Sequence, residues 1–278
     1  MSFTERPFFI SSPGPLCAVL TDPDNARASM QVVTGFGEEK KSSYRNMVEL
    51  CRAAASQGIR SLRFDLSGTG DSDADFGSLT LDRWSEDIAA AFDYLQKLPG
   101  AGRVSCVALR LGCLLASACN ISWESAVLIA PPMSGAAYMR EVLLQKQLRA
   151  AMTGSPRMSI AAMEESIARD GSLDLDGIKL GHRMFEGLRG LAFEQNSQLF
   201  KGRGMIVSFG ANPSQWERAA SACFTPEAGI VSLQLAPFWN QNDFLSSSIM
   251  NGAIIGHILN EVPASPLSDI GAKGGAGR

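Results

Sequence analysis

The stretch RVSCVALRLGCLLASA, at residues 103–118, decides the fold of this chain. Its first half is a short apolar run typical of a buried strand, and its second half has the leucine and alanine content of a packed helix. Residues 109–112 must therefore form a tight turn between the two. The small residues Ala108 and Gly112 stand two positions before and two after Arg110. This spacing is typical of a nucleophile elbow, a strained strand-to-helix turn whose usual motif is G-x-S-x-G.

The tip of this turn carries Arg110 where that motif has its serine. A guanidinium group stays protonated in proteins and has no lone pair with which to attack a carbonyl carbon. The sequence therefore predicts the geometry of an acyl-transfer site without its nucleophile.

Length and composition bound the class of protein. A chain of 278 residues with 45% hydrophobic content can bury one large core and carry an insertion. Its net charge of −3 gives no reason to expect nucleic acid or an anionic membrane as a partner. We expect no metal and no cofactor, and the oligomeric state stays open.

The cysteines and the chain start bear on localisation. The six cysteines lack C-x-x-C spacing, and several fall in apolar segments, as expected of buried free thiols in a reducing compartment. Residues 1–7 do not resemble a signal peptide, and no apolar run reaches the roughly 18 residues that a spanning helix needs. The sequence predicts a cytoplasmic protein without a membrane span.

Before and after the elbow, strand and helix patterns alternate. Strands are predicted at residues 7–10 and 16–20, as an antiparallel hairpin, and then at 29–34, 59–66 and 126–130. Helices are predicted at residues 39–57 and 81–98. The first should bury one face, composed of Tyr44, Met47, Val48, Cys51 and Ala55. This order predicts an α/β fold, a mostly parallel sheet with helices on both faces.

Residues 131–202 interrupt this alternation. Helices are predicted at residues 138–152, 159–169 and 182–191, with a short β segment or turn at 173–177. So long a stretch without a core strand indicates an inserted helical cap over the carboxyl edge of the sheet. The core then resumes with strands at 204–209 and 229–235 and helices at 214–223 and 244–259. We therefore expect a core at 1–130 and 203–262, a cap at 131–202 and a disordered tail at 263–278.

Several motifs carry a family resemblance. TGFG at 34–37, DLSGTGDS at 65–72, the elbow, the cap and the closing elements together resemble the α/β-hydrolase fold. More narrowly, GFGEEKKS at 35–42, LRLG at 109–112, PMSG at 132–135 and PFW at 237–239 resemble the type 2 hydrolases associated with exosortase and exopolysaccharide gene clusters. In that family an arginine also stands at the elbow tip. The resemblance implies a hydrolase or acyl-transfer activity on an ester, acyl or carbohydrate substrate, linked to exopolysaccharide production.

The other triad positions also depart from the superfamily pattern. The acid is expected after the strand that follows the cap, where Asn212 stands, and the base after the last strand, where the sequence reads LAPFW. The chain has two histidines, His182 in the predicted cap and His257 in the closing helix. A Ser-His-Asp mechanism is therefore not expected.

Backbone donors could still form a site at the elbow. The N–H of Leu111 and an N–H near Gly35 and Phe36 would make the oxyanion hole of the superfamily, at a helix N-terminus. With Arg110 these donors would trap a carboxylate, a phosphate or a sugar acid. Phe238 and Trp239, at the end of the last strand, either line this pocket or belong to the core.

Acidic residues offer an alternative for Arg110. Glu38, Glu39 or Asp65 could neutralise it as a structural ion pair. Glu38 and Glu39 suit the start of a helix, or one of them faces the pocket as a general base. Asp65 more often holds the loop that follows it.

Two hypotheses from different classes stay open. The first is an enzyme of the α/β-hydrolase superfamily with a degenerate triad, in which Arg110, Glu38 and Glu39 are the candidate catalytic residues. The second is a pseudoenzyme that binds a small anionic ligand or a protein partner in the old pocket.

Overall fold

A sheet of eight strands forms the centre of the computed structural model, which describes residues 2–100, 102–193, 200, 202–210, 217, 224, 228–240 and 246–260. The spatial order is β1-β2-β4-β3-β5-β6-β9-β10. The strands are β1 (Phe3–Ser11), β2 (Pro15–Pro23), β3 (Ala28–Val33), β4 (Ile59–Phe64), β5 (Val104–Leu109), β6 (Ser125–Ile129), β9 (Arg203–Phe209) and β10 (Gly229–Leu233). β2 is antiparallel to both β1 and β4, and the pairs from β4 to β10 are parallel. The predicted hairpin and parallel sheet are confirmed.

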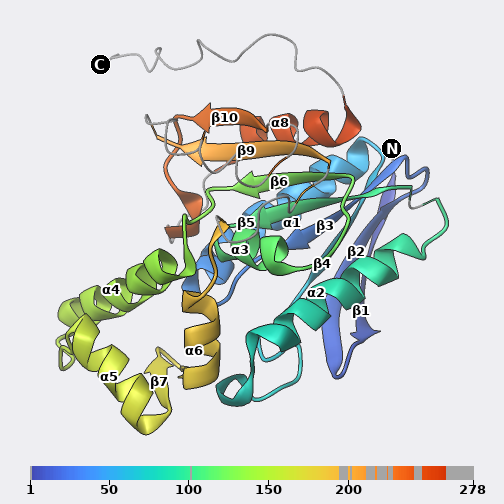
Figure 1. The fold of residues 1–278 in the computed structure, drawn as a ribbon. Coiled ribbons are helices and arrows are strands. Elements are labelled where there is room, and N and C mark those ends of the chain that lie inside the picture. The colour runs from blue at the N-terminus through green and yellow to red at the C-terminus, as the bar shows by residue number, and fades with distance from the viewer. Residues whose placement is uncertain are drawn as a thin grey trace, which may run out of the picture.

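Helices cover both faces of this sheet (Figure 1). α2 (Leu81–Gln96) and α3 (Leu111–Ala118) lie on one face, and α1 (Gly37–Ser56) and α8 (Ser248–Leu259) lie on the other. Side chains alternate along a strand, so β5 sends Cys106 and Ala108 into the cluster under α2 and α3, and Val107 and Leu109 into the cluster under α1 and α8. The strand that leads to the elbow is thus fixed from both sides.

The stretch between β6 and β9 contains the helices α4 (Gly135–Thr153), α5 (Ile160–Asp170) and α6 (His182–Arg189), with the antiparallel strands β7 (Ser172–Leu175) and β8 (Ile178–Gly181). Figure 1 shows these elements beside the rest of the molecule, below the sheet in that view. α4 begins pressed against the end of α6, because a Cβ at Gly135 would lie 1.6 Å from the Leu188 carbonyl oxygen. Buried side chains of α4 and α6 join the cluster under α2 and α3.

The prediction for one core residue is wrong. Tyr44 was expected on the buried face of its helix, but it is 51% exposed and its ring lies over the guanidinium of Arg63, at 5.3 Å. α1 packs on the central strands with Met47 and Cys51, so Tyr44 projects past them toward the charged side chain of β4. The cation–π contact with Arg63 stabilises the Tyr44 ring in this position although the residue is half exposed.

Some predictions concern parts of the chain outside the described residues, namely most of the helix at 214–223, Asn212 and the tail at 263–278. Among the helices that the structure describes, none combines the length and the apolar character that a bilayer crossing requires. Of the six cysteines, the five within the described residues are free thiols, four of them buried, as expected: Cys17, Cys51, Cys106, Cys113 and Cys119.

Candidate functional site

The turn after β5 has the backbone of a strained elbow. Arg110 has φ 52° and ψ −118°, a conformation rare for a residue with a side chain. Its N–H donates to the Ile129 carbonyl at 2.9 Å, which holds the turn against β6. Gly112 permits the close approach to β3, since a Cβ there would lie 2.2 Å from the Val33 carbonyl oxygen. Gly112 thus has the steric role predicted for it.

The Arg110 side chain is bound by two carboxylates. Its Nε donates to Glu39 Oε1 at 3.0 Å, and its Nη2 donates to Glu141 Oε2 at 2.6 Å. Nη1 makes a longer contact of 3.4 Å with the Ala130 carbonyl oxygen. Because each acid accepts from a different nitrogen of the guanidinium, α1 and α4 are both tied to the elbow.

Two aromatic rings complete the surroundings of this arginine. The guanidinium carbon lies 5.8 Å from the centre of the Tyr138 ring and 5.4 Å from that of Trp239. The Tyr138 hydroxyl donates to Glu39 Oε2 at 3.0 Å, so both oxygens of that carboxylate are bonded. We call Arg110, Glu39, Tyr138, Glu141 and Trp239 the arginine cluster.

Burial differs sharply among the acids of the arginine cluster. The side chains of Arg110 and Glu39 are 11% and 9% exposed, whereas that of Glu141 is 40% exposed. Burial raises the pKa of Glu39, against the lowering effect of Arg110 and Tyr138. Burial opposes the charge of Arg110, but the facing carboxylates outweigh it and raise its pKa. Burial and the Glu39 carboxylate raise the pKa of Tyr138 well above its usual value. Arg110 therefore stays charged, and Tyr138 stays a donor.

Of the three acids proposed as partners for Arg110, Glu39 takes that role. Glu38 is exposed and forms an ion pair with Lys41 at 2.8 Å. Asp65 pairs with Lys40 at 2.6 Å and accepts the N–H of Asp71, so it holds its own loop as expected.

Sequence reasoning missed Tyr138 and Glu141 as partners of Arg110. They are three positions apart on α4, which places both on one side of that helix. This spacing is the signal by which a paired role could have been proposed.

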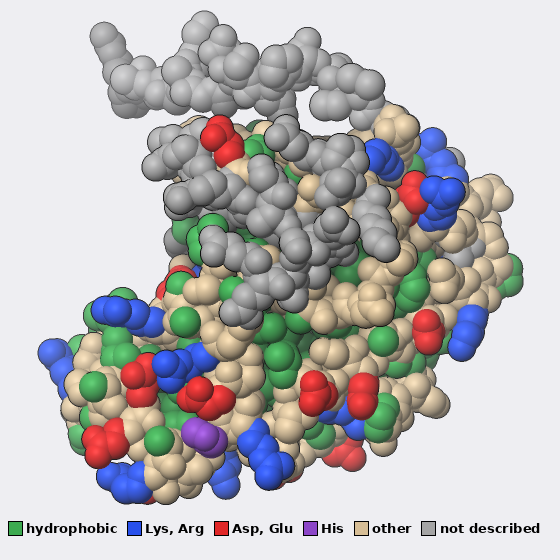
Figure 2. All heavy atoms as spheres, viewed as in Figure 1, with side chains coloured by type: hydrophobic (Ala, Val, Ile, Leu, Met, Phe, Trp, Pro, Cys, Tyr) green, Lys and Arg blue, Asp and Glu red, His purple; other side chains and the backbone are tan. Residues whose placement is uncertain are grey.

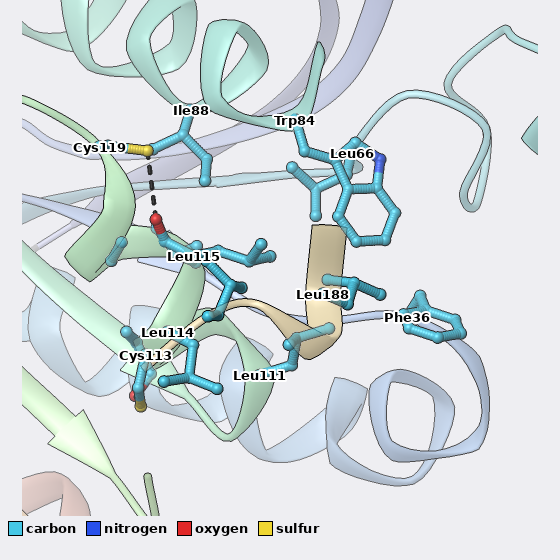
Figure 3. Packing of buried hydrophobic residues seen from close by; sticks show 14 of the residues in the cluster. Phe36, Leu66, Trp84, Ile88, Leu111, Cys113, Leu114, Leu115, Cys119 and Leu188 are labelled. Carbon is cyan, nitrogen blue, oxygen red and sulfur yellow. Dashed lines mark hydrogen bonds between the residues drawn. The ribbon is translucent and has the colours of Figure 1, made fainter. Parts of the chain in front are cut away.

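The predicted backbone donors lie where the loop after β3 meets the elbow. A Cβ at Gly35 would lie 3.0 Å from the Leu111 Cβ, so the two segments touch. The side chains of Phe36 and Leu111 belong to the core, at 4% and 0% exposure. Figure 3 shows both pointing toward Leu188 of α6 in the packed cluster. An oxyanion hole formed by their N–H groups stays a prediction.

Phe238 and Trp239 lie in the 3-10 helix η3 (Phe238–Asn240), and both are buried. Their rings meet edge to face at 5.2 Å, and each also contacts Phe209 of β9. Trp239 faces Arg110, while Phe238 packs in the cluster under α1 and α8. At the place expected for the catalytic base, the chain therefore has an indole that covers a guanidinium.

Neither histidine is at the elbow. His182 is exposed at the start of α6. The His257 carbonyl accepts from Arg203, the first residue of β9, whereas the elbow lies at the carboxyl ends of the parallel strands. Burial, and then the charge of Arg203, lower the pKa of His257 to about 4. The described part of the chain thus supplies no imidazole to a triad at this turn.

A cluster of metal-ligand types occurs elsewhere. Cys17, Asp65 and Asp71 have potential ligand atoms within 4.8 Å of one another. The Lys40 ammonium already neutralises Asp65, and burial and the neighbouring carboxylates raise the pKa of the Cys17 thiol. A protonated thiol is a poor metal ligand. We assign no metal to these residues.

Solved structures resemble this chain over nearly its whole length. Est1E from Butyrivibrio proteoclasticus, with ferulic acid bound, has a TM-score of 0.67 at 18% identity, over 91% of this chain and 98% of its own. The α/β hydrolase GrgF from Penicillium sp. sh18 has a TM-score of 0.62 at 14% identity, over 93% of this chain and 100% of its own. XC6422 from Xanthomonas campestris, an α/β serine hydrolase without lid, has a TM-score of 0.55 at 14% identity, over 96% of this chain and 99% of its own.

At identities this low, these likenesses establish the fold alone: the chain has the α/β-hydrolase fold. No model of a known protein family matches the chain, and no curated protein is similar to it in sequence. The narrower resemblance to the exosortase-associated hydrolases stays a prediction.

Proposed function

We propose that this chain is a non-catalytic protein of the α/β-hydrolase fold that binds a small anionic ligand at the elbow. The observation that carries the proposal is Arg110, which stands at the elbow tip and is held there by Glu39 and Glu141. Acyl transfer at this turn needs an attacking lone pair and a base that takes up its proton. A guanidinium bonded to two carboxylates supplies neither.

The unequal burial of the two acids supports an anion site. Glu39 is enclosed and bonded on both oxygens, whereas Glu141 is 40% exposed and holds a single Arg110 nitrogen. A carboxylate or phosphate from solution can replace Glu141 as the acceptor for Nη2 of Arg110. The N–H groups proposed for the oxyanion hole would add donors beside it. Glu141 thus acts as an internal competitor for the ligand.

Replacing Glu141 with glutamine should tighten the binding of small anions. The amide is neutral and no longer competes for Arg110, so the dissociation constant of acetate or phosphate should fall about tenfold. Calorimetric titration of both proteins measures this. Glu124→Gln is the matched control, because Glu124 also pairs with an arginine, the exposed Arg103. Equal affinities in the Glu141 variant and the natural sequence would contradict the anion site.

One observation favours a second function, a hydrolase or acyl-transfer enzyme that works without the triad. Glu39 is buried beside the elbow with a raised pKa and a bonded phenol, which are features of a general base. In this second proposal Glu39 activates water or an acyl acceptor, and Arg110 stabilises the charge that develops. The link to exopolysaccharide production rests on the sequence resemblance.

A hydrolase assay separates the two functions. We expect no turnover of short-chain esters, acyl thioesters or acylated sugars from pH 5 to pH 9. Arg110→Ser should be equally inactive, because a serine at the tip would have no histidine to take its proton. Turnover by the natural sequence that is lost in Glu39→Gln would establish the enzyme and refute the non-catalytic proposal.

A further inference from the structure

A cavity of about 270 Å³ lies between α1 and the strands β2, β3 and β4, and no member of the arginine cluster lines it. Val19, Val32 and Met47 contribute apolar walls, and the half-exposed ring of Tyr44 forms another side. The space suits a molecule smaller than most drugs, and the mixture of apolar walls with a few charged groups is that of a ligand site.

Two basic and two acidic side chains line this cavity, but they are not all paired. Lys40 and Asp65 neutralise each other at 2.6 Å. Arg63 forms no ion pair with any described carboxylate, and its buried Nε has no hydrogen-bond partner there. The charge of Arg63 acts on the Glu5 carboxylate at a distance, but that carboxylate forms its ion pair with Arg52, at 2.7 Å. Because Nε is enclosed by the protein, an acceptor in the cavity would bind the Nη groups of this half-buried guanidinium.

The orientation of Arg63 indicates what that acceptor is. Its guanidinium lies 5.3 Å from the centre of the Tyr44 ring, so one flat side is used for stacking. Stacking leaves the end of the group, with Nη1 and Nη2, for planar acceptors, and a carboxylate matches this end with two parallel bonds. Asp71, exposed at the same cavity, repels further negative charge and so favours a monoanion over a phosphate dianion.

We propose that this cavity binds a small carboxylic acid with an apolar body, whose carboxylate pairs with Arg63. The apolar part lies against Val19, Val32 and Met47 and beside the Tyr44 ring. This site is separate from the elbow and does not depend on the function proposed there.

Calorimetric titration of the full chain with phenylacetate tests the site, with 2-phenylacetamide as the neutral match. Phenylacetate should bind saturably, and the amide at least about tenfold more weakly. Arg63→Met should weaken the binding of phenylacetate by about tenfold or more. Arg103→Met, at an exposed arginine outside the cavity, should leave that affinity unchanged. Tyr44→Ala removes a half-exposed ring without opening the core and should weaken binding several-fold.

Other outcomes overturn the proposal. They are no saturable binding of phenylacetate, equal affinity for the acid and the amide, or an affinity that Arg63→Met leaves intact. Binding that survives Arg63→Met and rises in Glu141→Gln would assign the carboxylate to Arg110 instead. That result would support the elbow function while refuting the second site, so the two proposals fail independently.

Discussion

Replacing Arg110 with methionine should lower the free energy of unfolding by about 3–5 kcal/mol at neutral pH. The change removes the counter-charge of Glu39, which is 7% exposed and cannot turn toward water without disrupting the first turn of α1. Urea unfolding of the variant and the natural sequence measures the difference. Arg103→Met, which breaks an exposed pair with Glu124, should change stability by less than about 1 kcal/mol.

The loss should depend on pH in one direction. Burial already raises the pKa of Glu39 in the natural sequence, so the folded state holds this proton more tightly than the unfolded state does. Its contribution to stability therefore falls as pH rises through the raised pKa. Without Arg110 the pKa rises further, so the deficit should be larger at pH 8 than at pH 5. Adding Glu39→Gln to Arg110→Met should recover most of it, and a deficit independent of pH would show that Glu39 is not its cause.

Replacing Gly112 with alanine should lower the free energy of unfolding by about 3 kcal/mol or more. The added Cβ would lie 2.2 Å from the Val33 carbonyl oxygen and 2.7 Å from its carbon, and both are backbone atoms of a central strand that cannot move aside. Thermal and urea unfolding give the size of the loss.

Gly252→Ala on α8 is the matched control, because a Cβ there meets no atom within 4 Å. It should raise stability by about 0.5–1 kcal/mol through helix propensity. A Gly112 variant as stable as this control would mean that the elbow does not require its close contact with β3.

The fold could be predicted largely from local patterns. The turn predicted at residues 109–112 lies where β5 ends at Leu109 and α3 begins at Leu111, because a buried run, small residues and a leucine-rich segment each constrain the backbone locally. Tyr44 shows where such reasoning fails. Helical periodicity assigns it to the apolar face, but whether that face meets the sheet or its charged flank depends on where α1 lies, which periodicity does not contain.

The candidate site could be predicted only in part, because it too depends on where the helices lie. Neighbouring helical residues point about 100° apart, so only one of Glu38 and Glu39 can face the elbow, yet the sequence does not say which. Glu141 reaches Arg110 only because α4 packs across the turn, and that packing comes from distant contacts such as Gly135 against Leu188.

The arginine cluster joins parts of the chain that are far apart in sequence. Arg110 bonds to Glu39 across 71 positions and to Glu141 across 31, and Tyr138 bonds to Glu39 across 99. Closing such loops is entropically expensive, and these side chains meet only after β3, β5 and β6 have paired. We therefore expect the cluster to form late in folding, so that its energy slows unfolding of the native state more than it speeds folding.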